Sequence, residues 1–463
     1  MRAEAILEEI SEYCRRQGMA ESTFGRRAVN DGKFVNRLRY GGKVNESTVE
    51  RVRAFMGAGA RAPEQASVLE QHLIALPQGA LRAESEPEKN FRFYDNRQKY
   101  LMFVNTCSEK WMVAQRVAME LANLHPRPPA IRLFDAGVGD GTVLTRVMRT
   151  LHSRFAWVPF YVVGKEISLE DVRLSMEKMP DRFQEHPATC LVMTNMNYAE
   201  APWLAPHSVV TASSLVWKEV ALRGNSAADF DEQIAELQPF LAENWGAKVS
   251  KKSGNPVYEK PVALIIYRDD CRVLLDHILP RRGAVKADYD LVIASQPYRA
   301  RASTAFKAKR VIAPLAKALG PGGRLIGIHS CGGDPALEIV QKVWPGEEPF
   351  ATNRHDLLKT TKAELGKKAG QYNFSSQSDA RALFRYDMHT LPGEIDAESN
   401  SIGTSTLFAA WNAATYVAQI EDQRLQDAMT TEGYLQATKD VLKKHGALWF
   451  QDEAFVITRK RDI

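Results

Sequence analysis

Short apolar runs and amphipathic helix patterns alternate along the middle of the chain. Five mostly apolar runs have the length and composition of strands that are buried on both faces. They lie at 131–135, 159–167, 188–196, 289–295 and directly after the glycines at 320–323. Between some of them apolar residues repeat at helical spacing, as at 142–155 and 303–319. Such alternation predicts an α/β fold with a largely parallel sheet and helices on both faces.

The remaining carboxyl-terminal segments show the same two patterns less regularly. We expect strands at 262–267, 383–390 and 447–458. We expect helices at 214–223, 230–245, 353–368, 406–420 and 431–444. The polar segment 364–379 is interpreted as a loop. Residues 200–286 are far longer than a connection between the third and fourth strands requires, so we interpret them as an insertion that shapes the substrate pocket or carries oligomer contacts.

The first part of the chain has a different pattern. Residues 1–56 predict four short helices, with Gly41-Gly42 as a stop after the third. Residues 57–90 contain Gly/Ala-rich and Glu/Ser/Pro-rich stretches typical of a linker, with one helix expected at 68–76. The sequence therefore predicts a helical module at 1–56, a linker at 57–90 and an α/β domain at 91–463.

Composition narrows the class of protein. The chain has 463 residues, 44% of them hydrophobic and 25% charged, which is ordinary for a soluble protein of two or more domains. No apolar run reaches the roughly 18 residues of a membrane span, and the acidic start lacks the apolar core of a signal peptide. Five separated cysteines without a C-x-x-C pair favour a reducing cytoplasm and argue against a zinc site. We therefore expect a cytoplasmic protein with no metal and no membrane partner.

A glycine-rich turn follows the first strand. The strand ends in Asp135, and glycines stand at 137, 139 and 141, directly before a helix. Glycines at these positions let a backbone approach a nucleotide-like ligand closely. The spacing is G-x-G-x-G rather than the G-x-G-x-x-G of dinucleotide sites. Asp140 lies inside the loop, and an acid there disfavours a phosphate and tolerates a cationic ligand.

Asp-x-Gly-x-Gly-x-Gly after a strand resembles motif I of the class I S-adenosylmethionine-dependent methyltransferases. The resemblance implies a seven-stranded Rossmann-like sheet with S-adenosyl-L-methionine as cofactor. It also implies that the loop, with Asp135, Gly137, Gly139 and Gly141, packs against the methionine part and the ribose. Glu166, at the end of the second strand, matches the acid that takes the ribose hydroxyls, because a carboxylate accepts several hydrogen bonds.

Other segments extend the resemblance and also depart from it. The third strand ends in Asn195, where the family usually has an Asp that binds the adenine amine, and Met196 would pack on the adenine. Helical segments before the first strand often cover the cofactor in this family, so Tyr100 or its neighbours would reach the methionine carboxylate or simply pack on the sheet. Pro-Gly-Gly at 321–323 is similar to the family's entry into the fifth strand.

The fourth strand ends in Ser295-Gln-Pro-Tyr298, where the methyl acceptor and cofactor would meet. This sequence resembles the [D/N/S]-P-P-[Y/F/W] motif of enzymes that methylate amino groups of nucleic acids, with Gln296 in place of the first proline. The resemblance implies that Ser295 contacts the cofactor and that Tyr298 stacks on an acceptor. His329, at the end of the fifth strand, is a candidate general base, or alternatively a hydrogen-bonded rim residue.

The helices at 22–29 and 32–40 resemble the helix-turn-helix of phage-repressor-like DNA-binding domains. Carried over, the resemblance implies that DNA is contacted by Lys33, Asn36, Arg37 and Arg39. The alternative is a bundle that only packs on the α/β domain or forms a dimer contact. Two functions follow from the whole sequence: a methyltransferase acting on a small molecule, protein or nucleic acid, or a DNA-binding regulator that uses the fold as a sensor of the cofactor. A homodimer is compatible with both.

Overall fold

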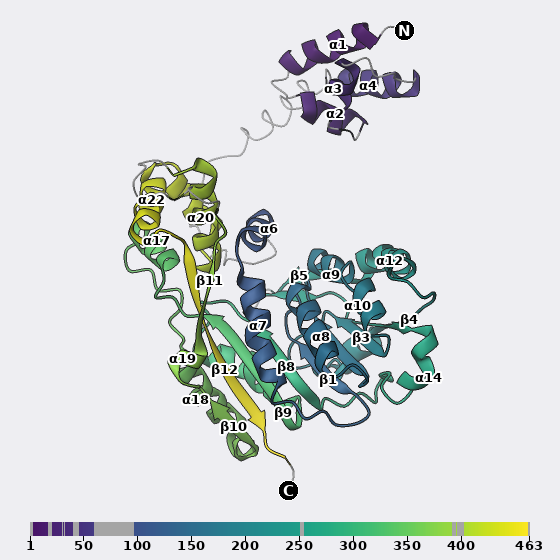
Figure 1. Cartoon of the computed structure of the whole chain (residues 1–463), viewed down its shortest axis with the longest axis vertical. Coiled ribbons are helices and arrows are strands. Elements are labelled where there is room, and N and C mark those ends of the chain that lie inside the picture. The colour runs from purple at the N-terminus through teal and green to yellow at the C-terminus, as the bar shows by residue number, and fades with distance from the viewer. Residues whose placement is uncertain are drawn as a thin grey trace, which may run out of the picture. The chain divides into compact units, whose positions relative to one another are not determined.

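The computed structural model divides the chain into two compact units, Met1–Pro87 and Glu88–Ile463 (Figure 1). The residues described are 3–16, 21–29, 31, 33–39, 46–59, 97–250, 254–390, 395 and 402–461. Most of the segment interpreted as a linker, including the helix expected at 68–76, lies outside these residues. Within them, no helix combines the length and the apolar character needed to cross a membrane.

The amino-terminal unit is a bundle of short helices. Its described helices are α1 (Ala3–Arg16), α2 (Glu21–Val29), α3 (Phe34–Arg39) and α4 (Glu46–Gly59). Each contributes apolar side chains to one separate core, in which the ring of Phe24 packs edge-on against Tyr13 and Phe55. Gly25 is required within α2, because a Cβ atom there would collide with the carbonyl group of Asp31, which precedes α3.

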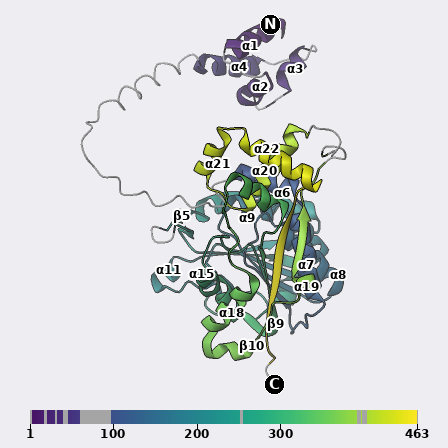
Figure 2. The same ribbon diagram turned by 90° about the vertical axis from the view of Figure 1, so that its left-hand side faces the viewer.

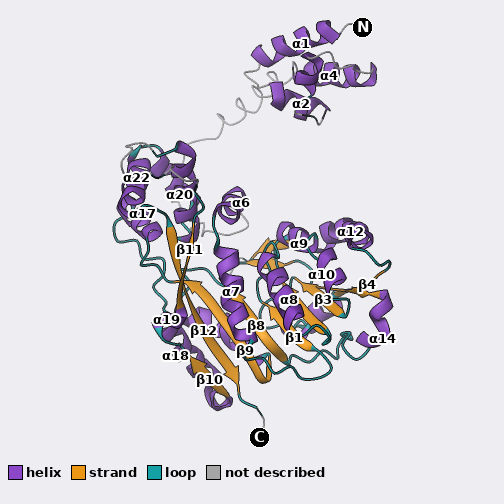
Figure 3. Ribbon diagram, in the orientation of Figure 1, coloured by secondary structure: helices purple, strands orange, loops and turns teal. Residues whose placement is uncertain are grey.

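The second unit is built on one twisted sheet, drawn as the central layer of strands in Figure 3. Its parallel core has the order β3-β2-β1-β8-β9. The bounds are β1 (Ile131–Asp135), β2 (Phe160–Lys165), β3 (Thr189–Thr194), β8 (Tyr289–Ser295) and β9 (Leu319–Ser330). All five strands were expected from the sequence. The chain order reverses between β1 and β8, and ligands bind at such a switch point, outside the carboxyl ends of the strands.

Both edges of the sheet extend beyond this core, so the sheet has ten strands rather than seven. On one side β12 (Trp449–Arg459) is antiparallel to β9 and pairs with β10 (Tyr372–Ser375) and β11 (Leu383–Asp387). On the other side β7 (Val262–Arg268) is antiparallel to β3, and β4 (Val216–Leu222) pairs with β7. The insertion at 200–286 therefore lengthens the sheet as well as covering it.

Two expectations about these edge segments were wrong. Residues 214–223 were expected to be helical, yet they contain β4, a half-buried edge strand whose Lys218 and Glu219 interrupt the apolar pattern. Residues 364–379 were interpreted as a loop, yet they contain β10, which is only four residues long. Both strands are defined by their partners in the sheet, and such pairing leaves little trace in a local sequence pattern.

Helices cover both faces of the sheet. One apolar core lies under α7 (Glu109–Leu121), α8 (Thr142–Arg154), α9 (Leu169–Met176), α10 (Pro180–Glu185), α12 (Ala227–Ala235) and α13 (Gln238–Asn244). The core on the other face includes a continuous helical stretch and α18 (Arg354–Leu365). That stretch consists of α15 (Thr304–Lys307), the π-helical turn η3 (Ala308–Ile312) and α16 (Ala313–Lys317).

A third core lies at one end of the sheet, where α20 and α22 gather near α6 (Figure 2). Its helices are α6 (Arg97–Thr106), α17 (Pro335–Val343), α20 (Thr404–Val417), α21 (Asp422–Met429) and α22 (Gly433–His445). Shorter elements complete the unit: η1 (Ala201–Trp203), α11 (Val209–Ser213), η2 (Asp269–Cys271), α14 (Arg272–Leu275), η4 (Gly366–Gln371), α19 (Asp379–Ala382) and the hairpin β5 (Ala247–Val249)–β6 (Pro256–Tyr258).

Candidate functional site

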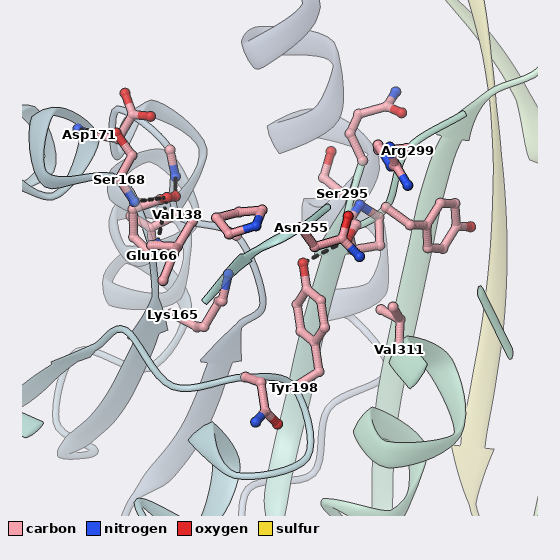
Figure 4. A pocket seen from close by; sticks show the side chains of 18 of the residues that line it. Val138, Lys165, Glu166, Ser168, Asp171, Tyr198, Asn255, Ser295, Arg299 and Val311 are labelled. Carbon is pink, nitrogen blue, oxygen red and sulfur yellow. Dashed lines mark hydrogen bonds between the residues drawn. The ribbon is translucent and has the colours of Figure 1, made fainter. Parts of the chain in front are cut away.

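A cavity of about 1090 Å³ opens at the carboxyl ends of the parallel strands. The glycine loop after β1 and the start of α9 line one side, and the loop after β8 and η3 line the other. Figure 4 shows these two sides, with Glu166 and Ser168 facing Ser295, Arg299 and Val311 across the cavity. The switch point predicted by the strand order is therefore the place where the cavity forms.

The three loop glycines have different roles. A Cβ atom at Gly137 would have no heavy atom within 4 Å, and the residue lines the cavity, so a side chain there would project into the ligand space. Gly139 adopts φ +55° and also lines the cavity. Gly141 adopts φ +81°, and its Cβ atom would lie 2.8 Å from the Cα atom of Ser175. Gly141 therefore allows α8 and α9 to pack closely and does not itself line the cavity.

Glu166 closes this loop from the end of β2. Its carboxylate accepts hydrogen bonds from the backbone N–H groups of Gly139 at 2.9 Å, Ile167 at 2.7 Å and Ser168 at 2.9 Å. A carboxylate has about four acceptor positions, so at least one remains for a ligand in the cavity. Burial raises the pKa of this carboxyl, although the neighbouring Lys165 and the backbone donors oppose the rise.

The two aspartates of the loop lie in different environments. Asp135 lines the cavity and accepts a hydrogen bond from Gly137 N–H at 3.1 Å, and burial raises its pKa to about 6. Asp140 instead pairs with Lys178 at 2.7 Å and bonds to Thr142. The cavity is therefore acidic here because of four other residues, namely Glu109, Asp135, Glu166 and Asp171. A tolerance for a cationic ligand was expected from Asp140, but in the structure these four acids, and not Asp140, line the cavity.

Of the two residues expected to contact the adenine, one lines the cavity and the other does not. Asn195 lines the cavity, but its side-chain amide donates to the carbonyl of Lys260 at 2.8 Å and accepts from the N–H of Val262 at 2.8 Å. It thereby joins the end of β3 to the start of β7. Met196 is fully buried in the core on the other side and is not among the residues that line the cavity.

The loop after β8 is held rigidly at the opposite side. Gln296 adopts φ +46°, and its side-chain amide bonds to Ser330 Oγ at 3.0 Å and to Asp452 at 3.3 Å. Tyr198 donates its hydroxyl to the carbonyl of Pro297 at 2.6 Å. Gln296 thus replaces a proline while still restraining the loop, and Ser295 and Tyr298 both line the cavity.

A buried hydrogen-bond chain runs from Tyr298 into the protein. The Tyr298 hydroxyl lies 2.6 Å from His329 Nδ1, and His329 Nε2 lies 2.7 Å from Glu453. Arg354 completes the chain with an ion pair to Glu453 at 2.8 Å. Burial lowers the pKa of His329, although Glu453 opposes the change. His329 does not line the cavity itself, and the hydroxyl of Tyr298 links it to the cavity wall.

Sequence reasoning missed several residues of this site. Glu453 is an acid within the apolar run of the final strand, and that interruption was its only signal. Lys165 and Tyr198 line the cavity beneath the loop of Glu166, and Lys165 stood directly before Glu166 at a strand end. The hairpin β5–β6 forms a further wall, joined to the loop after β3 by a hydrogen bond of 2.8 Å from Tyr258 to Glu200.

The four candidate DNA-contacting residues lie on the exposed side of α3 or directly before it. Arg39 pairs with Glu21 at 2.7 Å, and Arg37 pairs with Asp31. Both arginines are therefore neutralised within the amino-terminal unit. Lys33 and Asn36 remain exposed, and this pattern adds nothing in favour of DNA binding.

Comparisons with known proteins return methyltransferases among the solved structures. No protein-family profile and no curated relative match the chain. Geranyl diphosphate methyltransferase in complex with geranyl diphosphate and sinefungin is 12% identical, with 74% of this chain and 76% of that chain covered and a TM-score of 0.26. Loganic acid methyltransferase with S-adenosylhomocysteine is 9% identical, with 82% of this chain and 99% of that chain covered and a TM-score of 0.28.

A third similar structure is Haemonchus contortus phosphoethanolamine N-methyltransferase 2, bound to phosphomonomethylethanolamine and S-adenosylhomocysteine. It is 11% identical, covers 75% of this chain and 52% of its own, and has a TM-score of 0.26. Likenesses this weak carry no argument about function. The class of fold, an α/β Rossmann-like sheet with helices on both faces, is defined by this chain's own strand order.

Proposed function

We propose that the protein is an S-adenosylmethionine-dependent methyltransferase, which transfers a methyl group to an acceptor held in the same cavity. The observation that carries the proposal is the open space at Gly137, bordered by Asp135 and by the carboxylate of Glu166. This space follows the motif that resembles motif I. A side chain at Gly137 would project into it, and its acidic surroundings suit a ligand with two positive charges and one negative charge.

The residues present fit this cofactor. Glu166 would hold the ribose hydroxyls through its remaining acceptor position, while its bonds to Gly139, Ile167 and Ser168 keep it in place. When bound, the cofactor supplies an electrophilic methyl group on a sulfonium that is already a good leaving group. The protein therefore has to align the acceptor and exclude water more than it has to supply reactive groups.

The opposite wall performs that alignment. The bonds of Gln296 and Tyr198 fix the loop after β8, and the hydroxyl of Tyr298 is held by His329. The ring of Tyr298 therefore has a fixed orientation at the cavity wall, where it would support the acceptor. Because His329 Nε2 is bonded to Glu453, its Nδ1 is the nitrogen available to the tyrosine hydroxyl.

The first prediction tests the open space at Gly137. We expect Gly137→Val to weaken binding of S-adenosylmethionine by at least about tenfold, because the added methyl groups would occupy the ligand space. Isothermal titration calorimetry on the full chain measures this. Gly370→Val is the matched control, since a Cβ atom there also meets nothing within 4 Å but the residue lies outside the cavity.

Circular dichroism melting of both variants separates a ligand effect from a loss of folding. Absence of binding to the unaltered protein would contradict the proposal. Equal affinity in Gly137→Val and Gly370→Val would show that the ligand does not occupy the space beside the loop.

A further inference from the structure

Charge is unevenly distributed around the cavity. The side next to the glycine loop carries the four acids named above, with Lys110 paired to Glu109 at 3.4 Å. The remaining walls carry mostly basic side chains, from the end of β2, the hairpin, the loop after β8 and η3. These residues are Lys165, Lys248, Arg299, Lys309 and Arg310. The acidic side matches the cationic cofactor, so the basic walls call for a ligand of opposite charge.

Two acids, Glu200 and Glu259, also line those walls, but within the described part of the chain neither forms an ion pair with a lysine or with Arg310. The carboxylate of Glu200 is already occupied, because it accepts from His207 N–H at 2.9 Å, from the Tyr258 hydroxyl at 2.8 Å and from Asn197 at 2.5 Å. Glu259 is exposed at the end of the hairpin. Among the described residues, Lys165, Lys309 and Arg310 form no ion pair.

Lys165 is the least solvated of these basic residues. Lys165 directly precedes Glu166 at the end of β2, and the two side chains interact through their charges without forming an ion pair. Its Nζ atom lies 4.9 Å from the centroid of the Tyr198 ring, and Figure 4 shows it directed into the cavity. Burial lowers the pKa of this amine. The charge of Glu166 opposes this change, but a half-buried ammonium group that lies over an aromatic ring and forms no ion pair is stabilised further when an anion arrives.

We propose that the methyl acceptor is a small molecule with an anionic group, a carboxylate or a phosphate, and that Lys165 binds this group. Lys309 and Arg310, which are exposed on η3, attract the anion into the cavity. The inference rests on the proposed function, since it assigns the second ligand of the same site. A small acceptor is favoured over a nucleic acid, because Lys165 lies deep in a cavity whose size is that of small-ligand sites.

The experiment uses the full chain saturated with S-adenosylhomocysteine. Phenyl phosphate and benzoate are titrated as anionic probes, with benzyl alcohol and benzylamine as neutral and cationic counterparts. We expect at least one anion to bind about tenfold more tightly than benzyl alcohol. The anion that binds more tightly distinguishes phosphate from carboxylate.

Variants locate the anion. Lys165→Met should reduce the affinity for the preferred anion by about tenfold or more, and Lys165→Arg should retain part of it. The double variant Lys309→Ala/Arg310→Ala should lower the affinity for the anion, while the affinity for S-adenosylhomocysteine stays unchanged. Lys317→Ala is the matched control, because it is an exposed lysine on α16 outside the cavity.

Different outcomes overturn different claims. Failure of S-adenosylhomocysteine to bind refutes the proposed function itself. The proposal of an anionic acceptor is refuted if S-adenosylhomocysteine binds but no anion does. It is also refuted if benzylamine binds as tightly as the anions. If Lys165→Met binds the anion with unchanged affinity, Lys165 is not the residue that binds the anionic group. A single-stranded oligonucleotide that binds through Lys309 and Arg310, with no effect of Lys165→Met, would show a nucleic-acid acceptor instead.

Discussion

At the residue scale, the two carboxylates beside the glycine loop are held by backbone N–H groups. Asp135 accepts from Gly137, and Glu166 accepts from Gly139, Ile167 and Ser168. Burial raises the pKa of both groups, because it removes them from water more strongly than the charges of Lys165 near Glu166 and Lys110 near Asp135 compensate. Such a site is unfavourable for the protein alone and becomes favourable when a cationic ligand binds. Its signature is therefore a pH-dependent stability.

The sign of that dependence follows from Asp135. Its pKa is about 6 in the folded protein against an ordinary 3.8, so the folded protein holds the proton more tightly. The stabilisation is complete below the ordinary pKa and is lost as the pH rises through about 6. We expect Asp135→Asn to gain stability relative to the unaltered protein between pH 4 and pH 7, by up to about 3 kcal/mol. Urea unfolding without cofactor at both pH values measures the gain.

Asp231→Asn supplies the comparison, because Asp231 is an exposed carboxylate on α12. A stability difference between Asp135→Asn and the unaltered protein that is the same at pH 4 and pH 7 would contradict the raised pKa. The cofactor affinity of Asp135→Asn should fall in either case, since the variant removes a negative charge from the cavity.

At the element scale, the loop depends on how closely α8 approaches α9. Gly141 precedes α8 with φ +81°, and the backbone of Ser175 on α9 occupies the space where a Cβ atom would be. The bonds of Glu166 to the loop and to the start of α9 join the same elements from inside the cavity. Strand, loop and both helices therefore form one rigid support for the ligand.

A substitution pair tests this packing. Gly141→Ala combines a left-handed backbone with a collision, whereas Gly346→Ala has φ +84° and nothing within 4 Å of the added Cβ atom. We expect Gly141→Ala to lose about 1–3 kcal/mol more unfolding free energy than Gly346→Ala, because only the first must separate two packed helices. Chemical denaturation measures both, and an equal loss would show that α9 moves away without cost.

At the scale of the whole molecule, the two units have separate cores. The apolar cluster of the amino-terminal bundle contains only residues of α1 to α4, and the three clusters of the second unit contain none of them. Every described residue that lines the cavity lies in Glu88–Ile463. The described residues of the second unit therefore form this cavity by themselves.

Removal of residues 1–87 tests this independence. We expect the remaining chain to fold and to bind S-adenosylmethionine with an affinity within about twofold of the full chain, because no cavity residue is lost. Calorimetry on both proteins at the same concentration provides the comparison. A tenfold weaker affinity in the shortened chain would mean that the bundle contributes to the site.

The sequence by itself determined the features that are encoded in short, local stretches of residues. The five parallel strands are buried on both faces and are therefore continuous apolar runs, and the glycines and Glu166 stand at their ends. Chain order alone then predicts that these ends meet at one edge of the sheet. The tertiary structure decided the rest. It placed β4 and β10 at the sheet edges, directed Asn195 to backbone groups, buried Met196 and joined His329 to Glu453 across 124 residues. Pairing between distant segments and the charge balance of a cavity depend on which side chains meet in space, and a one-dimensional pattern does not record this.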